Sequence, residues 1–446
     1  MEVGTKLGNE PSRRAVQSLR ELATRSRSLL DLQGFWAIAD QGVVSLGNFL
    51  TTIILARTVS PELYGLWTVL FGLILVLNVV HASLIVYPIT LIAAGSELDK
   101  SNNKISGALV LTSVVSIPLG LCMLGAAAFI GAGGIGFWAW AALLCWQLQE
   151  TTRRALMARF SCRKALIGDA ISYLCQALLV WLLAKSAGLS LERAFAAIAV
   201  TCGLAALVQA WQLRGQIGIP SGLRKLFREF WRAGRWSLWS ELTANVGFQA
   251  SPWVLFLMRG AGAAAGYQAI SNLLGLSHPV MLSLGNVIVP EAARARARKG
   301  FLAARRVAKI HATQGGLLLL VCFGILTLFP KQLLSLFYGS DSAYLTLGPD
   351  IRLFAAVYML FFVFLALKYL LNALQETRAQ LVAELICCGL LGIVIVPLVL
   401  EFGLAGAIGA LGVWFGARVI CSVVILRRVS AEQVSEKESV KESVLG

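Results

Sequence analysis

Two long stretches without any charged side chain limit what this chain can fold into. Residues 63–96 and 105–149 contain no Asp, Glu, Lys or Arg. A helix needs about 20 apolar residues to cross a bilayer, so each stretch must hold a crossing helix, and the longer one has room for two. The 446-residue chain is 57% hydrophobic and 14% charged, whereas soluble domains average about 25% charged residues. The sequence therefore predicts an all-α integral membrane protein.

Apolar runs separated by polar residues, Gly or Pro predict twelve transmembrane helices. We place them at 35–56, 65–93, 106–130, 136–157, 165–184, 192–213, 236–258, 265–289, 310–329, 351–374, 380–400 and 403–426. Most Lys and Arg residues fall in alternate connections between these runs. Cytoplasmic loops carry the excess of positive charge, so both termini are expected in the cytoplasm.

The twelve helices divide into two sets of six. The predicted parts are a cytoplasmic N-terminal tail (1–33), an N-lobe (34–213), a cytoplasmic amphipathic linker (214–235), a C-lobe (236–427) and a disordered C-terminal tail (428–446). In the linker, Leu223, Leu226, Phe227, Phe230 and Trp231 share one helical face and basic residues cover the rest. This pattern predicts a helix lying on the anionic inner leaflet.

The first helices of the two lobes resemble each other. The segments FWAIADQGVVSLGNFL and RWSLWSELTANVGFQA align at one offset, which matches Asp40 with Glu241, Asn48 with Gln249, and Gly65 with Gly266. An even number of helices separates the matched segments. The lobes would therefore be parallel repeats related by an axis along the membrane normal.

Polar side chains within these two helices predict a wet cleft between the lobes. Glu241, Asn245 and Gln249 step by about 40° around a helix and form one stripe, and Asp40 and Asn48 lie in the matching helix. Polar groups that face lipid are costly, so such stripes face the bundle interior. Three readings of Asp40 stay open: a structural pair with an arginine, a carboxylate that couples transport to protons or cations, or hydration near the headgroups.

Two basic residues lie inside the C-lobe helices. Arg418 is near the middle of its helix, where it could hold an anionic substrate group or pair with a carboxylate of another helix. Lys368 lies toward the inner end of its helix, from which it could reach the headgroups. Glu150 precedes Arg153 and Arg154 by three and four residues, a spacing that favours a local ion pair.

Several other classes of protein are disfavoured by the sequence. The net charge of +16 is spread over loops, which indicates membrane topology rather than nucleic-acid binding. The nine cysteines form no CxxC motif and lie mostly within apolar runs, so we expect no disulfide framework and no metal site. No P-loop and no Ser/His/Asp grouping on a loop is present, so neither catalysis nor a cofactor is predicted.

The connection between the first two predicted helices carries a family resemblance. The segment ARTVSPELYGLWTVL at 56–70 resembles the turn at this place in bacterial polysaccharide-repeat-unit flippases of the Wzx type. The matching residues are Ala56, Arg57, Pro61, Glu62, Tyr64 and Gly65; Leu63 departs from the aromatic residue or Glu that is frequent there. Twelve helices in two lobes also resemble the wider multidrug/oligosaccharidyl-lipid/polysaccharide (MOP) superfamily, whose fold is MATE-like.

The resemblance implies a function and a set of roles. The substrate would be an undecaprenyl-pyrophosphate-linked oligosaccharide, moved from the cytoplasmic to the periplasmic leaflet of a bacterial inner membrane for exopolysaccharide, capsule or O-antigen synthesis. A proton or sodium gradient would drive the cycle, and a polysaccharide polymerase and export machinery would be partners. The implied roles are pyrophosphate binding by Arg418, Lys368 and Arg57, sugar binding by Asn48, Asn245 and Gln249, and ion coupling by Asp40 and Glu241.

Three other functions remain as alternatives. A MATE-type cation-coupled drug or metabolite antiporter would have the same architecture, but it would favour an acidic cavity. A membrane polymerase or ligase would favour a large outer loop, whereas the longest outer loop expected here, near 330–350, is short. A structural scaffold would have no need of polar stripes in matching helices.

Overall fold

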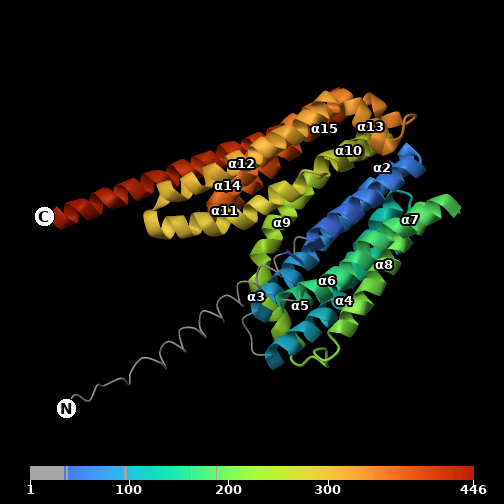
Figure 1. Cartoon of the computed structure of the whole chain (residues 1–446), viewed down its shortest axis with the longest axis horizontal. Helices are drawn as coiled ribbons and strands as arrows, with labels where there is room; N and C mark the ends of the chain where they lie inside the picture. The colour runs from blue at the N-terminus through green and yellow to red at the C-terminus, as the bar shows by residue number, and fades with distance from the viewer. Residues whose placement is uncertain (1–34, 37–38, 95–97, 160, 187, 446) are drawn as a thin grey trace, which may run out of the picture.

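The computed structural model describes residues 35–36, 39–94, 98–159, 161–186 and 188–445, with only the backbone for 91–94, 98–101, 377 and 432–445. These residues form two helical bundles (Figure 1). The N-lobe contains the helix Ala39–Thr58, α2 (Pro61–His81), the π-turn η1 (Ala82–Val86), α3 (Tyr87–Ala94), α4 (Leu98–Phe129), α5 (Gly133–Ala158), α6 (Cys162–Asp169), the π-turn η2 (Ala170–Leu174), α7 (Cys175–Ser186) and α8 (Leu191–Gln212). The predicted N-terminal tail lies outside the described residues.

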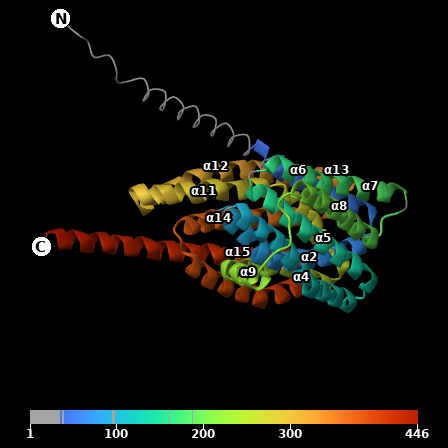
Figure 2. The same ribbon diagram turned by 90° about the horizontal axis from the view of Figure 1, so that it is seen from below.

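The C-lobe follows with the same helical character. It comprises α9 (Leu223–Arg259), α10 (Ala261–Gly275), α11 (His278–Lys299), α12 (Phe301–Leu328), α13 (Pro330–Tyr338), the 3-10 turn η3 (Ala343–Thr346), α14 (Gly348–Ala373) and α15 (Thr377–Leu445). In both views α11 and α12 run side by side as a hairpin (Figure 1, Figure 2).

The described residues of the twelve predicted segments are helical apart from the turn at 276–277 and a few terminal residues, and the all-α prediction is confirmed for the described part of the chain. By length and hydropathy, 8 of the described helices could cross a membrane, or up to 9 when α10 and α11, which meet at 51°, count as one span. The candidates do not include α5 and α9, where Trp, Gln and Arg side chains lower the hydropathy. The count of twelve spans, with both termini in the cytoplasm, stays a prediction.

The last two predicted helices form a hairpin within α15. Gly403 has φ 57° and ψ −124°, a conformation outside the helix. The chain folds back there so closely that a Cβ on Gly406 would overlap the carbonyl oxygen of Leu398. Eight residues of uninterrupted helix would separate these positions by about 12 Å, so the two segments are antiparallel neighbours.

The linker differs from its prediction. It is not a separate surface helix, because residues 223–235 form the first turns of α9 without a break. Leu226 and Phe230 are buried in a hydrophobic cluster with Leu84 and Ile105 of the N-lobe. Two of the five apolar side chains that the sequence assigned to the leaflet, Leu226 and Phe230, therefore pack on protein, which removes them from water. Phe227 and Trp231 of the same face stay exposed.

The C-terminal tail also differs from its prediction, because α15 continues as helix to Leu445. No Gly or Pro occurs between Ala417 and Leu445. Glu, Lys, Gln and Arg, which are good helix formers, are frequent in its last part. The end of α15 projects beyond the other helices of the C-lobe (Figure 1).

Apart from α9, which packs along α2 and η1, the two lobes are joined at one end of the molecule. Phe49 and Phe337 meet edge to face at 5.2 Å, and Asn272 of α10 donates a hydrogen bond to the hydroxyl of Tyr64 at 2.8 Å. Gly65 lies so close to the backbone of Ala261 that any larger residue would overlap it. From this end the two bundles diverge, and α9 crosses between them (Figure 1).

Candidate transport site: two clusters of buried charge

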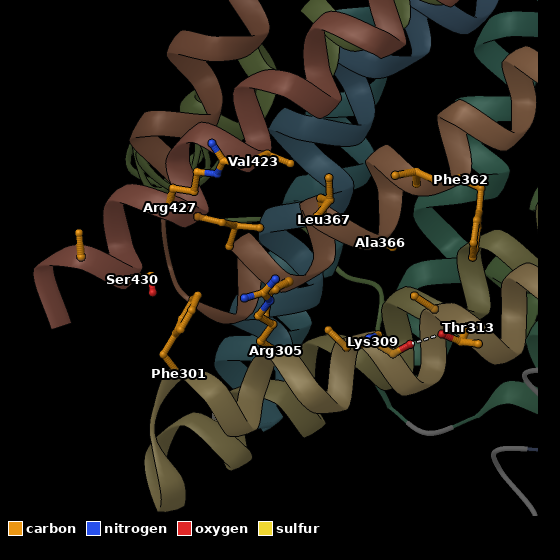
Figure 3. Close-up of a pocket in the computed structure, with 16 residues that line it drawn as sticks. Phe301, Arg305, Lys309, Thr313, Phe362, Ala366, Leu367, Val423, Arg427 and Ser430 are labelled. Carbon is orange, nitrogen blue, oxygen red and sulfur yellow. Dashed lines mark hydrogen bonds between the residues drawn. The ribbon is translucent and has the colours of Figure 1, made fainter. Parts of the chain in front are cut away.

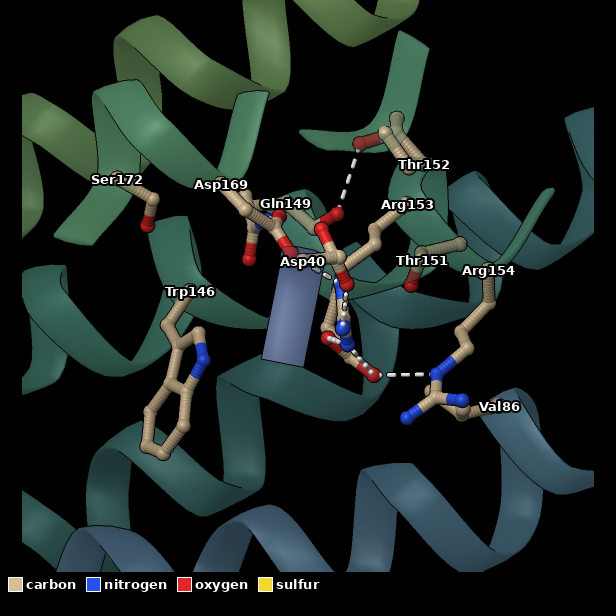
Figure 4. Close-up of polar contacts among 12 residues, drawn as sticks. Asp40, Val86, Trp146, Gln149, Thr151, Thr152, Arg153, Arg154, Asp169 and Ser172 are labelled. Carbon is tan, nitrogen blue, oxygen red and sulfur yellow. Dashed lines mark hydrogen bonds and ion pairs between the residues drawn. The ribbon is translucent and has the colours of Figure 1, made fainter. Parts of the chain in front are cut away.

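The N-lobe buries a cluster of charges around one arginine, Arg153 of α5 (Figure 4). Its Nη2 lies 2.6 Å from Oδ2 of Asp40, and its Nε lies 2.5 Å from Oδ2 of Asp169. Its Nη1 lies 3.1 Å from Oε2 of Glu150. Asp40 comes from the first described helix, Glu150 from α5 and Asp169 from the end of α6. We call these four residues the N-lobe cluster.

Acid exceeds base in the N-lobe cluster. Glu150 has a second partner in Arg154, whose Nε lies 2.6 Å from Oε1, so two arginines face three carboxylates. Asp40 is 1% exposed and Asp169 is fully buried. Within the described residues Oδ1 of Asp40 has no hydrogen-bond partner. A buried carboxylate is costly unless it is paired, so this surplus charge is where a proton or a cation would be most stabilised.

Local irregularities in two helices accompany this cluster. The π-turn η2 begins directly after Asp169, and η1 begins directly after His81. Nε2 of His81 lies 2.9 Å from Oγ1 of Thr151, which is on α5 two residues before Arg153. Single π-turns are frequent at functional sites. Here both occur where a polar side chain reaches α5.

Hydrogen bonds from uncharged side chains surround the N-lobe cluster. Gln149 donates to Oδ1 of Asp169 at 2.6 Å, which leaves both oxygens of that carboxylate in contact with protein. Thr152 donates to Oε1 of Gln209 on α8 at 2.8 Å. Gln176 of α7 donates to Oγ1 of Thr51 at 3.2 Å. These bonds tie the first described helix, α5, α6, α7 and α8 together.

The C-lobe buries a simple ion pair instead. Arg418 is 3% exposed, and its Nε and Nη2 lie 2.8 and 2.6 Å from Oε2 of Glu384. Both residues are on α15, on opposite sides of the turn at Gly403. The guanidinium lies over the rings of Phe364 and Trp414, with centroid distances of 3.9 and 4.2 Å. Cation–π contacts of this kind stabilise a desolvated guanidinium by about 2 kcal/mol.

Lys368 gives this part of the C-lobe a surplus of positive charge. It lines a small pocket together with Arg418 and Glu384, and α9 contributes Ser240 and Ala244. We call this the C-lobe pocket. Its volume is about 40 Å³, which is enough for ordered water, since one molecule needs about 10–15 Å³. Nη1 of Arg418 is buried without a hydrogen-bond partner in the described part of the chain.

Arg57 is not part of either charged cluster. Its Nε and Nη2 donate to the carbonyl oxygens of Phe337 and Leu336, at 2.5 and 2.6 Å. Those carbonyls belong to the last turn of α13, where helical carbonyls lack intrahelical partners. Arg57 thus links the N-lobe to the C-lobe at the joined end, away from Arg418 and Lys368, with which the sequence had grouped it.

The predicted polar stripes are only partly brought together. Gln249 of α9 packs against Gly72 of α2. The approach is so close that a Cβ added to Gly72 would lie 2.5 Å from Oε1 of Gln249. Asn245 is half-buried and donates to the backbone oxygen of Glu241 at 2.9 Å. Asn48 is also half-buried, and its backbone oxygen accepts from Thr52 at 3.0 Å.

The predicted equivalence of Asp40 and Glu241 is not seen in their surroundings. Asp40 is buried beside Arg153, whereas Glu241 is exposed and makes no ion pair among the described residues. A carboxylate without a basic partner is unstable in the interior. Because no described arginine pairs with Glu241, it stays at the surface.

The sequence missed how Arg153 organises the N-lobe. Its local pairing with Glu150 was predicted and is confirmed at i, i+3. A structural pair of Asp40 with an arginine was one of the three readings of Asp40, and the structure shows that pair with Arg153; the contact of Arg153 to Asp169 was not foreseen. A signal was present, because Arg153 falls inside a predicted helix rather than in a loop. For Arg418 the sequence left two alternatives, an anionic substrate group or a carboxylate of another helix. The structure shows the second, with Glu384 as the carboxylate.

The region 238–398 of the C-lobe matches the MatE family model. A search of curated protein sequences finds no match to this chain. Among solved structures, the inward-facing conformation of a multidrug resistance MATE family transporter of the MOP superfamily has a TM-score of 0.70 at 13% identity, covering 89% of this chain and 96% of that one.

Two further structures are similar over nearly the same span. The lipid II flippase MurJ in an inward closed conformation has a TM-score of 0.71 at 12% identity, with coverage of 88% and 87%. The MATE multidrug transporter DinF-BH, solved in complex with a ligand, has a TM-score of 0.65 at 17% identity, with coverage of 90% and 95%. The chain therefore has the fold of MOP superfamily transporters, in which drug transporters and a lipid flippase share one architecture.

Proposed function

We propose that the chain is an ion-coupled flippase for undecaprenyl-pyrophosphate-linked oligosaccharide repeat units. It would move them from the cytoplasmic to the periplasmic leaflet of a bacterial inner membrane, for exopolysaccharide, capsule or O-antigen synthesis. A polymerase and export machinery would take up the product. Two lobes joined at one end suit alternating access, and an external lipid tail can pass between them.

The positive surplus of the C-lobe pocket carries this proposal. Arg418 and Lys368 face a single carboxylate, Glu384. A pyrophosphate is too large for a pocket of about 40 Å³, so it would first meet Lys368. It would then replace Glu384 on Arg418 as the pocket opens. Charge-assisted bonds to a phosphate oxygen are comparable in strength to those with a carboxylate, which makes this exchange of partners energetically small.

We assign ion coupling to the N-lobe cluster. Its surplus carboxylate charge is relieved when one proton or cation binds near Asp40. Glu241 is the weaker candidate because it is exposed and unpaired within the described chain. Asn48, Asn245 and Gln249 would serve the sugar hydroxyls. Arg57 would keep the joined end closed rather than bind pyrophosphate.

A cation-coupled drug or metabolite antiporter is the second candidate. The surplus acid of the N-lobe cluster favours it, since a cationic drug could be bound there. The same fold in DinF-BH, a multidrug transporter solved with a bound ligand, makes this alternative concrete.

Reconstituted liposomes separate the two candidates. A fluorescent polyprenyl-pyrophosphate oligosaccharide is inserted, and its translocation is scored by access of a glycosidase to the sugar. We expect transfer by the wild type, a loss of at least tenfold in Lys368→Gln, and tighter pyrophosphate binding in Glu384→Gln, which frees Arg418. Uptake of a cationic dye without any lipid transfer would refute the flippase and establish the antiporter.

A further inference from the structure

A groove on the side of the C-lobe lies outside both charged clusters. It has a volume of about 920 Å³ and runs between α12 and the second half of α15, with α14 as its floor. Figure 3 shows side chains of all three helices directed toward this space. We call it the lateral groove. None of the residues assigned to transport lines it.

The lining of the lateral groove is mainly apolar. On α14 its residues are Phe362, Val363, Ala366, Leu367 and Leu370, a spacing that places them on one helical face. Small side chains on α12, Ala308 and Ala312, leave the space open. The small side chains leave an open apolar trough where larger ones would have filled the space. On a membrane protein, a trough of this size suits a hydrocarbon chain.

Three cations lie at this groove, and no acid opposes them. Arg305 and Lys309 are one turn apart on α12, and Arg427 faces them from α15. All three are exposed. No Asp or Glu is among the lining residues, and in the described part of the chain none of the three cations makes an ion pair. Ser430 adds a hydroxyl group at the same place.

We propose that the lateral groove is a binding site for an anionic phospholipid of the bilayer. Arg305, Lys309 and Arg427 would hold the phosphate, with bidentate bonds available from the two arginines. An acyl chain would lie along α14 over Ala366 and Leu367. A neutral or zwitterionic lipid would fit the trough but would leave three cations without a matching charge. The proposal does not depend on which cargo the protein transports.

A second basic surface supplies the matched control. On the other side of α12, Arg294, Arg298 and Arg306 line a separate groove, together with Glu291 and Lys299. Glu291 there is bonded to His311 at 2.9 Å. This groove has fewer apolar side chains and an acid among its cations, so it has less to offer a lipid chain.

Native mass spectrometry of the purified full chain tests the proposal. The protein is titrated with phosphatidylglycerol or with phosphatidylcholine of the same acyl chains, and the retained lipid is counted. We expect one phosphatidylglycerol to be retained by the wild type, and its affinity to fall at least tenfold in Arg305→Gln/Lys309→Gln/Arg427→Gln. The control Arg294→Gln/Arg298→Gln/Arg306→Gln carries the same charge change and should keep the lipid.

A second variant separates a lipid site from a general attraction of charge. Ala366→Trp fills the trough and leaves every cation in place, so it should also lose the retained lipid. Equal loss in both triple variants, or full retention in Ala366→Trp, would overturn the proposal. So would equal retention of phosphatidylcholine. Displacement by inorganic phosphate alone would show an anion site without a lipid and would overturn it too.

Discussion

The two lobes bury charge in different ways. In the N-lobe one guanidinium, Arg153, contacts three carboxylates from three helices. In the C-lobe Arg418 has one carboxylate partner, and two aromatic rings lie against its guanidinium. The first arrangement has surplus acid and the second, with Lys368, has surplus base. Under the proposed function this difference would fit the two lobes to opposite ligands, a coupling cation in the N-lobe and an anionic headgroup in the C-lobe.

The largest effect is expected when the shared partner of the N-lobe is removed. Arg153→Met leaves three carboxylates with only Arg154, and unpaired buried charge costs about 3–5 kcal/mol. Thermal unfolding in detergent should show this loss. Arg154→Met is the control, because its side chain is 38% exposed and exposed pairs contribute at most about 1 kcal/mol. Equal losses in the two variants would contradict the central place of Arg153.

The C-lobe pair should behave as a unit that can be replaced. Glu384→Leu alone strands Arg418 and should cost about 3 kcal/mol or more. In Glu384→Leu/Arg418→Met both charges are gone, and replacing a buried pair with apolar residues is often neutral or stabilising. The double variant should therefore unfold near the wild-type temperature. A double variant as unstable as the single one would show that other residues depend on the pair.

A smaller effect is expected from the arginine that joins the lobes. Arg57→Gln removes two hydrogen bonds to carbonyl oxygens of α13, made by an exposed side chain, and an ordinary hydrogen bond contributes only about 0.5–1.5 kcal/mol net. Spin labels on α2 and α10 should report wider separations at the joined end. Arg259 makes similar bonds to Val399 and Leu400, but within the C-lobe. Arg259→Gln should lower the unfolding temperature and leave the label distances unchanged; the same shift in both variants would refute this role of Arg57.

The smallest effect is expected at the residue that the repeat paired with Asp40. Glu241→Gln changes an exposed side chain, and such changes usually alter stability by less than about 0.5 kcal/mol. Asp40→Asn removes a buried contact with Arg153 and should cost more. Parallel denaturant titrations compare them, and a larger loss in Glu241→Gln would restore the predicted equivalence.

Much of the fold could be predicted because hydrophobic runs and their breaks are local properties. The predicted segments are helical in their described residues, apart from the turn at 276–277 and a few terminal residues, and the chain has a MATE-like fold. The sequence could not show that Leu226 and Phe230 pack on the N-lobe, because an apolar side chain suits a lipid surface and a protein surface equally well. Only the position of Leu84 and Ile105 in space decides between the two.

The charged clusters were harder to predict because they join distant parts of the chain. Asp40 and Arg153 are 113 residues apart, whereas Glu150 and Arg153 are three apart and their pair was predicted. Arg57 was assigned to pyrophosphate binding because it matches a family motif, but its partner in the structure, Phe337 of α13, lies 280 residues away along the chain. Local spacing identifies which residues carry charge, and tertiary structure decides which charges meet.

The division of roles between the lobes is tested most directly by the response of Asp40→Asn to an ion gradient. Translocation of the lipid-linked oligosaccharide is measured in liposomes with and without a pH or sodium gradient. We predict that the ion gradient accelerates transfer by the wild type. Asp40→Asn should still transfer the lipid down the concentration gradient of the lipid, at a rate that is the same with and without the ion gradient. Undiminished acceleration in Asp40→Asn would contradict the assignment of coupling to the N-lobe cluster.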